Sequence, residues 1–142
     1  MRRANAATGS GPFGAVISIG PHRLTADEPL AVGGLYAGPD PYEFLLAGLG
    51  ASTVMTPRLH ANRKGWPLSH IEGRIRHAAR ATDGAPMDVF DREIRLDGEL
   101  SAEERSQLLA IADHCPVSRT LAAGVTLQTR LGELAAVGEA TA

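Results

Sequence analysis

The stretch that decides the fold is "GPDPYEFLLAGLGASTVMTPRLHANRKGWPL", residues 38–68. The apolar residues that recur in it at helical spacing are Tyr42, Leu45, Leu46 and Leu49. This spacing is typical of an amphipathic helix. Asp40 is a candidate N-cap, and Pro41 suits the first helical position. Gly65, which follows two basic residues, indicates where the helix ends.

Two polar or unusual residues interrupt the buried face expected for this helix. Ser52 falls on that face, where a small polar group needs a hydrogen-bond partner. One interpretation is a small helical residue whose hydroxyl bonds back to a carbonyl one turn earlier. Pro57 costs about 3 kcal/mol inside a helix and frees the carbonyl of Thr53, so we expect a kink there.

Strand patterns and a second helix surround this central segment. The segments with strand-like patterns are residues 14–20, 21–29, 70–80, 87–100 and 124–131. The first two should form a hairpin, and residues 81–86 should form a turn. Ser101 and Glu104 have the spacing of a capping box, and Pro116 should end that helix near Cys115. The order β-β-α-β-β-α-β predicts an α+β fold.

Length and composition narrow the class of protein. We expect one domain over residues 1–142, with a loose lead-in at 1–12 and a frayed tail at 132–142. The net charge of -2 shows no excess of basic residues of the kind that nucleic-acid-binding proteins carry. The longest apolar run, 44–55, is too short to span a bilayer. No apolar stretch follows the N-terminal arginines, and a single cysteine allows no internal disulfide, so we expect a cytoplasmic protein.

Cys115, the only cysteine, lies beside Pro116 with His114 and Arg119 nearby. At the C-terminal end of the predicted helix, the helix dipole disfavours a thiolate. His114 and Arg119 could offset this effect if they point back toward the sulfur. A buried structural cysteine is the alternative interpretation. The five histidines have no metal-binding spacing and no nucleotide-binding loop is present, so we expect no metal or other cofactor.

Three stretches together resemble the OsmC and organic hydroperoxide resistance family: "HRLTADEP", the block at 38–68, and "CPVSRTL". The resemblance runs from about residue 14 to residue 131. It implies a bacterial, cytoplasmic, thiol-dependent peroxidase of the oxidative stress response. It also implies an intertwined homodimer, in which antiparallel sheets wrap two central helices and the active sites lie at the interface.

The resemblance further implies a cycle with two cysteines. An attacking cysteine reduces an organic hydroperoxide and becomes a sulfenic acid, and a resolving cysteine then forms a disulfide with it. An external dithiol resets the pair. No cofactor takes part in this cycle.

The site residues of the family carry over unevenly. Cys115 matches the resolving cysteine, whereas Ser52 occupies the position of the attacking cysteine. A serine hydroxyl has no sulfenic acid step, so the two-cysteine cycle cannot run in this chain. Tyr42 stands where the hydroperoxide branch has its glutamate, with Glu43 one residue later. Glu43 and Arg23 are therefore the candidates for the carboxylate and the arginine that support the thiol.

Three hypotheses follow from this departure. The first is residual peroxidase activity through Cys115 alone, with an external thiol as reductant. The second is a non-catalytic binding module that holds a hydrophobic small molecule in an apolar pocket at the dimer interface. The residues expected to line that pocket are Tyr42, Leu45, Leu46, Leu49 and Met55. The third is that Ser52 is an engineered replacement, in which case the natural protein is an ordinary two-cysteine peroxidase.

Overall fold

The computed structural model describes residues 1–82 and 85–133, and these fall into two compact units. The first unit contains Met1–Pro41 and the segment from Thr126 onward. The second unit is Tyr42–Val125, and it holds the helices and the longer strands. The two units are described separately below.

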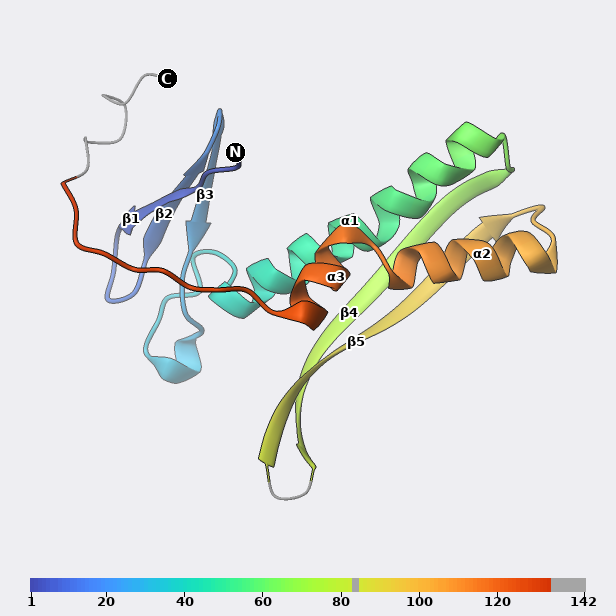
Figure 1. Cartoon of the computed structure of the whole chain (residues 1–142). Helices are drawn as coiled ribbons and strands as arrows, with labels where there is room; N and C mark the ends of the chain where they lie inside the picture. The colour runs from blue at the N-terminus through green and yellow to red at the C-terminus, as the bar shows by residue number, and fades with distance from the viewer. Residues whose placement is uncertain (83–84, 134–142) are drawn as a thin grey trace. The chain divides into compact units, whose positions relative to one another are not determined.

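The first unit contains a three-stranded antiparallel sheet in the order β1-β2-β3 (Figure 1). Its strands are β1 (Asn5–Thr8), β2 (Ala15–Ile19) and β3 (His22–Ala26). The hairpin of β2 and β3 was predicted, and Gly20 makes its turn at a φ of 55°. Strand β1 corrects the expectation of a loose lead-in over residues 1–12. Its small and polar residues carry no apolar strand pattern, and they are ordered by pairing with β2.

A loop and a short 3-10 helix, η1 (Leu30–Val32), follow β3. Asp27 organises this loop from a buried position, because its carboxylate accepts hydrogen bonds from the backbone N–H groups of Ala37 at 3.1 Å and Glu28 at 2.8 Å. These two bonds hold the pKa of the Asp27 carboxyl below its usual value. A Cβ on Gly34 would collide with the carbonyl oxygen of Glu28, so this glycine is needed for the close approach of the backbone.

The second unit is built around helix α1 (Pro41–Lys64). The helix begins at Pro41 and stops before Gly65, whose φ is 69°, as the sequence predicted. Its buried residues are Leu49, Thr53, Pro57 and Ala61, which follow one another at intervals of four. The helix is continuous through Pro57, and the kink stays a prediction.

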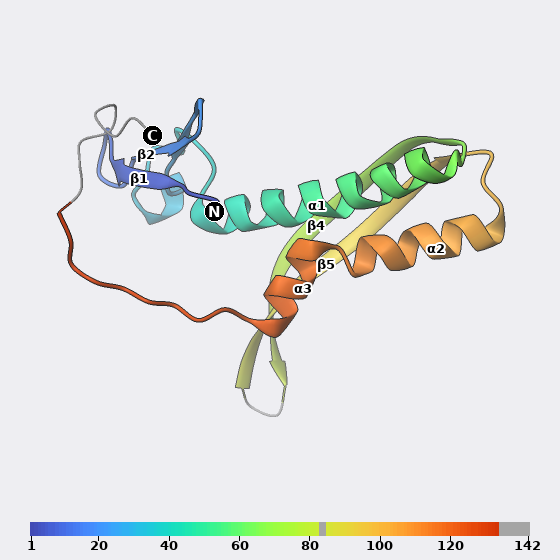
Figure 2. The ribbon, with the colours of Figure 1, turned by 45° about the horizontal axis from the view of Figure 1, so that its top comes forward.

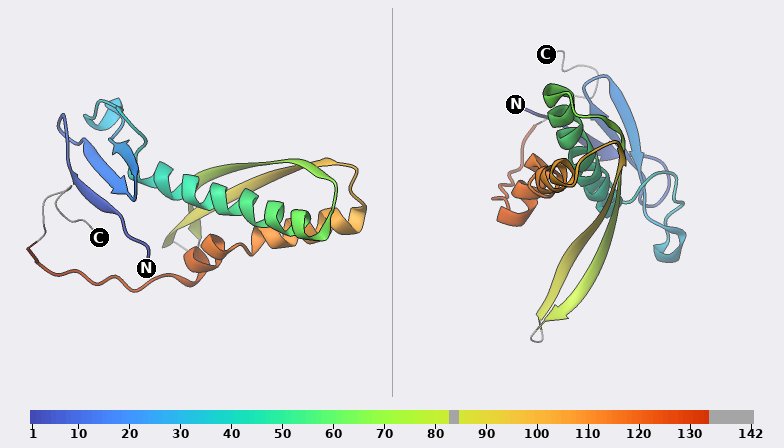
Figure 3. Two further views of the ribbon diagram at one scale, coloured as in Figure 1. Left: turned by 90° about the horizontal axis from the view of Figure 1, so that it is seen from above. Right: turned by 90° about the vertical axis from the view of Figure 1, so that its right-hand side faces the viewer.

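A long antiparallel ribbon supports α1. Strands β4 (Leu68–Thr82) and β5 (Ala85–Gly98) pair along their length, and α1 and α2 (Ala102–Asp113) both lie on one face of the ribbon (Figures 1 and 3). The predicted capping box starts α2, with reciprocal hydrogen bonds of 3.1 and 2.9 Å between Ser101 and Glu104. The apolar residues that join the ribbon to both helices are Ala61, Trp66, Leu68, Ile71, Leu96, Leu100 and Leu108.

The end of the chain differs from the prediction. A third helix, α3 (Pro116–Ala123), follows Cys115 and begins beside the middle of α1 (Figure 2). The strand predicted at 124–131 does not form within this chain, because these residues have no strand conformation in the structure. A strand needs a hydrogen-bonded neighbour, and no described strand of the chain pairs with it. The α+β class is confirmed, with the order β-β-β-α-β-β-α-α in place of β-β-α-β-β-α-β.

Some expectations fall outside the described residues. The centre of the turn predicted at 81–86 lies at residues 83–84, and nearly all of the tail at 132–142 lies beyond residue 133. The single domain over 1–142 stays a prediction. Within residues 1–82 and 85–133, no helix combines the length and the apolar character needed to cross a membrane.

Candidate thiol site

The single thiol lies at a helix start. Cys115 is fully buried, at 0% exposure, and is the N-cap residue of α3, with Pro116 in the first helical position. Helix α2 ends two residues earlier, at Asp113. This geometry corrects the expectation that a helix C-terminus disfavours the thiolate, because the positive end of the α3 dipole lies at Cys115.

Hydroxyl groups surround the thiol. Thr53 of α1 places its Oγ1 3.9 Å from the Cys115 Sγ. Ser118 of α3 donates its hydroxyl to the Cys115 carbonyl oxygen at 2.8 Å. The Ser52 Oγ accepts a hydrogen bond from the Val117 N–H at 3.5 Å. The Ser52 hydroxyl therefore lies at the first turn of α3, of which Cys115 is the N-cap.

These groups change the acidity of the thiol. Burial raises the pKa of Cys115, since a charged sulfur loses its hydration. Hydrogen bonds from the Ser52 and Ser118 side chains, the Ser118 backbone and the Thr53 side chain oppose burial and outweigh it. The resulting pKa is lowered from 9.0 to about 7. A substantial fraction of Cys115 is therefore thiolate, the reactive form, at neutral pH.

We expect the ultraviolet absorbance of the Cys115 thiolate to titrate with a midpoint near pH 7 rather than 9.0. Ser118→Ala should move the midpoint upward, because it removes a hydrogen bond that favours the thiolate. Cys115→Ser supplies the blank, and Thr120→Ala is the control, since that hydroxyl of α3 donates to the Pro116 carbonyl at 3.2 Å. A midpoint near 9.0 in the unmodified chain would contradict the assignment.

Arg92 of β5 is a site residue that the sequence analysis missed. Its side chain is 14% exposed. One terminal nitrogen donates to Thr53 Oγ1 at 3.1 Å and to the Ala112 carbonyl at 2.9 Å. The other donates to the Asp113 carbonyl and to the Asp113 carboxylate, both at 3.1 Å. Arg92 thereby ties α1 to the end of α2 and fixes the threonine that faces the thiol.

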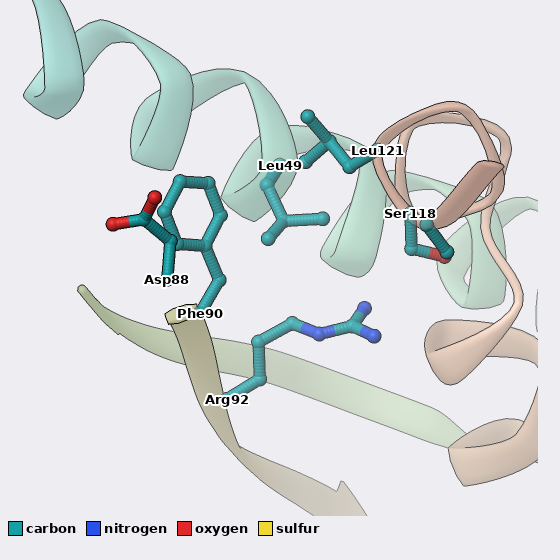
Figure 4. A pocket seen from close by; sticks show the side chains of 7 residues that line it. Leu49, Asp88, Phe90, Arg92, Ser118 and Leu121 are labelled. Carbon is teal, nitrogen blue, oxygen red and sulfur yellow. The ribbon is translucent and has the colours of Figure 1, made fainter. Parts of the chain in front are cut away.

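An open pocket of about 310 Å³ lies beside this network (Figure 4). Its lining residues are Leu49 of α1, Asp88, Phe90 and Arg92 of β5, and Ser118, Leu121 and Ala122 of α3. The volume is at the lower end of the range usual for small-molecule sites. Ser118 and Arg92 connect the pocket to the surroundings of Cys115, because one bonds the Cys115 carbonyl and the other bonds Thr53.

The expected pocket residues are only partly gathered here. Leu49 lines the pocket, and the Tyr42 ring stacks on His77 with centroids 4.9 Å apart. Leu46 is half-buried. Leu45 and Met55 are 46% and 66% exposed and lie outside the pocket lining.

The expected supporting residues are dispersed. His114 and Arg119 are exposed, and the His114 ring bonds the Ala110 carbonyl at 3.1 Å rather than the thiol. Glu43 is half-buried in the first turn of α1. Arg23 lies exposed on β3, in the first unit. Support of the thiol by Glu43 and Arg23 stays a prediction. Within the described residues, no group of His, Cys, Asp or Glu side chains could hold a metal ion.

Solved structures identify the fold. An organic hydroperoxide resistance protein OsmC from Legionella pneumophila superposes with a TM-score of 0.65 at 22% identity, over 85% of this chain and 88% of that one. An OsmC-like protein from Mycoplasma pneumoniae gives 0.71 at 19% identity, over 86% and 87%. An organic hydroperoxide resistance protein from Elizabethkingia anophelis gives 0.61 at 18% identity, over 84% and 86%. These likenesses establish the OsmC fold.

The sequence itself places the chain more closely. The model of the OsmC-like protein family matches residues 33–130, which include α1, β4, β5, α2 and α3. The chain belongs to the OsmC-like protein family. No curated protein matches it in sequence.

Proposed function

We propose that this chain reduces organic hydroperoxides with Cys115 as its only redox-active residue and an external thiol as reductant. The observation that carries the proposal is the environment of the thiol. Cys115 starts a helix, contacts Thr53, and has a pKa of about 7. A thiol with this acidity is both ionised and nucleophilic near neutral pH.

The chemistry requires two external thiols for each peroxide. The Cys115 thiolate attacks the outer oxygen of the hydroperoxide, the O–O bond breaks, and the alkoxide leaves as an alcohol after taking a proton from water. Cys115 is then a sulfenic acid. One external thiol displaces its hydroxyl as water and forms a mixed disulfide. A second external thiol attacks that disulfide and releases the Cys115 thiolate.

Ser52 has a supporting part in this scheme. It occupies the position that the resemblance assigns to the attacking cysteine, and its hydroxyl is one of the groups that lower the pKa of Cys115. It also accepts the Val117 N–H at the start of α3. Ser52 thus favours the thiolate without being able to form a disulfide with it.

We further propose a homodimer. Leu45, Met55 and Leu59 are 46%, 66% and 49% exposed, and their spacing places them on one stripe of α1. A second copy of the chain covering this stripe would bury it. The segment 124–131, which has a strand pattern but no partner among the described strands, is available for pairing with the other copy. Sedimentation equilibrium at twice the chain mass is the expected result, and a monomer at micromolar concentration would contradict the dimer.

The proposed setting is the bacterial cytoplasm during oxidative stress, with no membrane or nucleic acid as partner. A chain whose only cysteine is unpaired and needs external thiols suits a reducing compartment.

The deciding experiment is consumption of cumene hydroperoxide with dithiothreitol as reductant. We expect the chain to consume peroxide, Cys115→Ser to fall to the uncatalysed rate, and Thr120→Ala to stay within about twofold, as an exposed substitution should. Equal rates for the chain and Cys115→Ser would reject the peroxidase.

The pocket favours a second candidate function, a binding module. Leu49, Phe90 and Leu121 form an apolar wall, and the thiol itself is fully buried. In this case the chain is silent toward peroxide, and native mass spectrometry of the purified protein should show a bound hydrophobic molecule. A ligand-free spectrum, together with no shift in melting temperature across a hydrophobic library, would count against it.

A further inference from the structure

The pocket beside the thiol carries two opposite charges in its wall. Asp88 and Arg92 lie on the same face of β5, with Phe90 between them in sequence. In Figure 4, the Asp88 carboxylate and the Arg92 guanidinium lie on opposite sides of the pocket, with Leu49 between them. The two ends of the pocket therefore differ in charge.

The positive end is already neutralised. Arg92 is 14% exposed, and its two terminal nitrogens make four hydrogen bonds. The Asp113 carboxylate, at 3.1 Å, balances its charge. A ligand carboxylate would have to displace these bonds to reach the terminal nitrogens of Arg92.

The negative end is open. The Asp88 side chain is 70% exposed, and its described partner is the His77 ring at 2.8 Å. That ring is held in place by Tyr42, stacked at 4.9 Å, and by Phe90, edge-on at 5.0 Å. The charges of Asp88, Arg92 and Asp113 sum to -1, and because Arg92 is paired with Asp113, the remaining carboxylate at the pocket is that of Asp88.

We propose that Asp88 determines specificity, so that the pocket accepts uncharged or cationic aromatic molecules and rejects anions. The wall of Leu49, Phe90 and Leu121 supplies the apolar surface. If the chain is the peroxidase proposed above, its preferred substrates are uncharged organic hydroperoxides rather than hydroperoxides that carry a carboxylate. Only this statement about substrates rests on the proposed function. A unit negative charge on a ligand close to Asp88 weakens the affinity of that ligand by about fivefold, even at the dielectric constant of water and without screening by salt.

Two fluorescent probes with the same ring system test the proposal without turnover. They are N-phenyl-1-naphthylamine, which is neutral, and 1-anilinonaphthalene-8-sulfonate, which is anionic. We expect the neutral probe to bind more tightly to the chain. Asp88→Asn should lower the dissociation constant of the anionic probe, so that the ratio of the two dissociation constants becomes about fivefold smaller. Leu121→Trp, which fills the pocket, should weaken both probes.

The control is Glu93→Gln, because this carboxylate is on the same strand, is 72% exposed and lies outside the pocket lining. It should leave the ratio within about twofold. The proposal is overturned if Asp88→Asn leaves the ratio unchanged, if Leu121→Trp leaves both probes unchanged, or if the neutral probe does not saturate the chain. If the chain distinguishes the two probes by charge but consumes no peroxide, the proposed peroxidase function is wrong and the proposal on Asp88 stands.

Discussion

Ser52→Cys should make the chain consume cumene hydroperoxide at least about 100-fold faster at limiting dithiothreitol, because an internal thiol replaces a dilute external one. The Ser52 side chain lies close enough to Cys115 to lower the pKa of the thiol, and its hydroxyl accepts the Val117 N–H at 3.5 Å. A sulfur in place of the Ser52 hydroxyl lies where it can attack or be attacked by its neighbour. Intramolecular reactions with such positioning reach effective concentrations far above millimolar.

Mass spectrometry after one equivalent of peroxide should show the internal disulfide in Ser52→Cys, with both thiols lost together. Ala47→Cys is the matched control, since it adds a cysteine to an exposed position of the same helix. That variant should keep the rate of the unmodified chain and form no internal disulfide. If Ser52→Cys behaves like Ala47→Cys, the two positions do not meet and the role assigned to Ser52 is wrong.

Arg92→Met should lower the free energy of unfolding by about 1–3 kcal/mol for each buried group that it leaves without its charged donor. The substitution keeps an apolar stem of similar length but removes all four hydrogen bonds of the guanidinium. Thr53 is fully buried, and it and the Ala112 carbonyl would each lose a charged donor. Each buried group left unpaired costs about 1–3 kcal/mol.

Urea unfolding measures this loss, and Arg95→Met is the matched control. Arg95 lies on the same strand but is 62% exposed, and it forms surface ion pairs with Glu72 at 3.1 Å and Asp97 at 3.4 Å. Such pairs contribute about 0–1 kcal/mol. Equal losses for both variants would show that Arg92 is an ordinary surface charge.

The elements that the sequence predicted correctly are those with local signals. Pro41 and Gly65 bound α1, and the Ser101–Glu104 pair starts α2, because each signal acts through hydrogen bonds or φ angles within a few residues. The hairpin of β2 with β3 was predicted for the same reason, since sequential strands with a turn between them pair with each other. For β4 and β5 the sequence predicted the two strands, and the structure adds their pairing.

The end of the chain could not be predicted from local signals. Pro116 predicts the end of α2, but it is also the first residue of α3, and proline suits both situations. The segment 124–131 alternates like a strand, yet pairing depends on a neighbour that sequence alone does not supply. The end of α2 beside the thiol was therefore predicted correctly, whereas the start of α3 on its other side was missed.

Arg92 shows how a site residue can be hidden within a correct strand. The sequence analysis identified β5, and Arg92 shares the parity of Phe90, Ile94 and Leu96, the apolar side of that strand. A charged residue on the apolar side is a signal of a buried partner. Its partners, Thr53 and Asp113, come from two other elements, and only the fold brings them together.

The complete burial of Cys115 has one more consequence. A reagent, the peroxide of the proposed reaction included, reaches this sulfur only when the residues that cover it move, so the rate of alkylation reports how often the site opens. Because the chain has no other cysteine, every modified molecule records the same local opening event. The rate of Cys115 alkylation, followed by mass spectrometry, thus measures local opening at one point of the chain without hydrogen exchange.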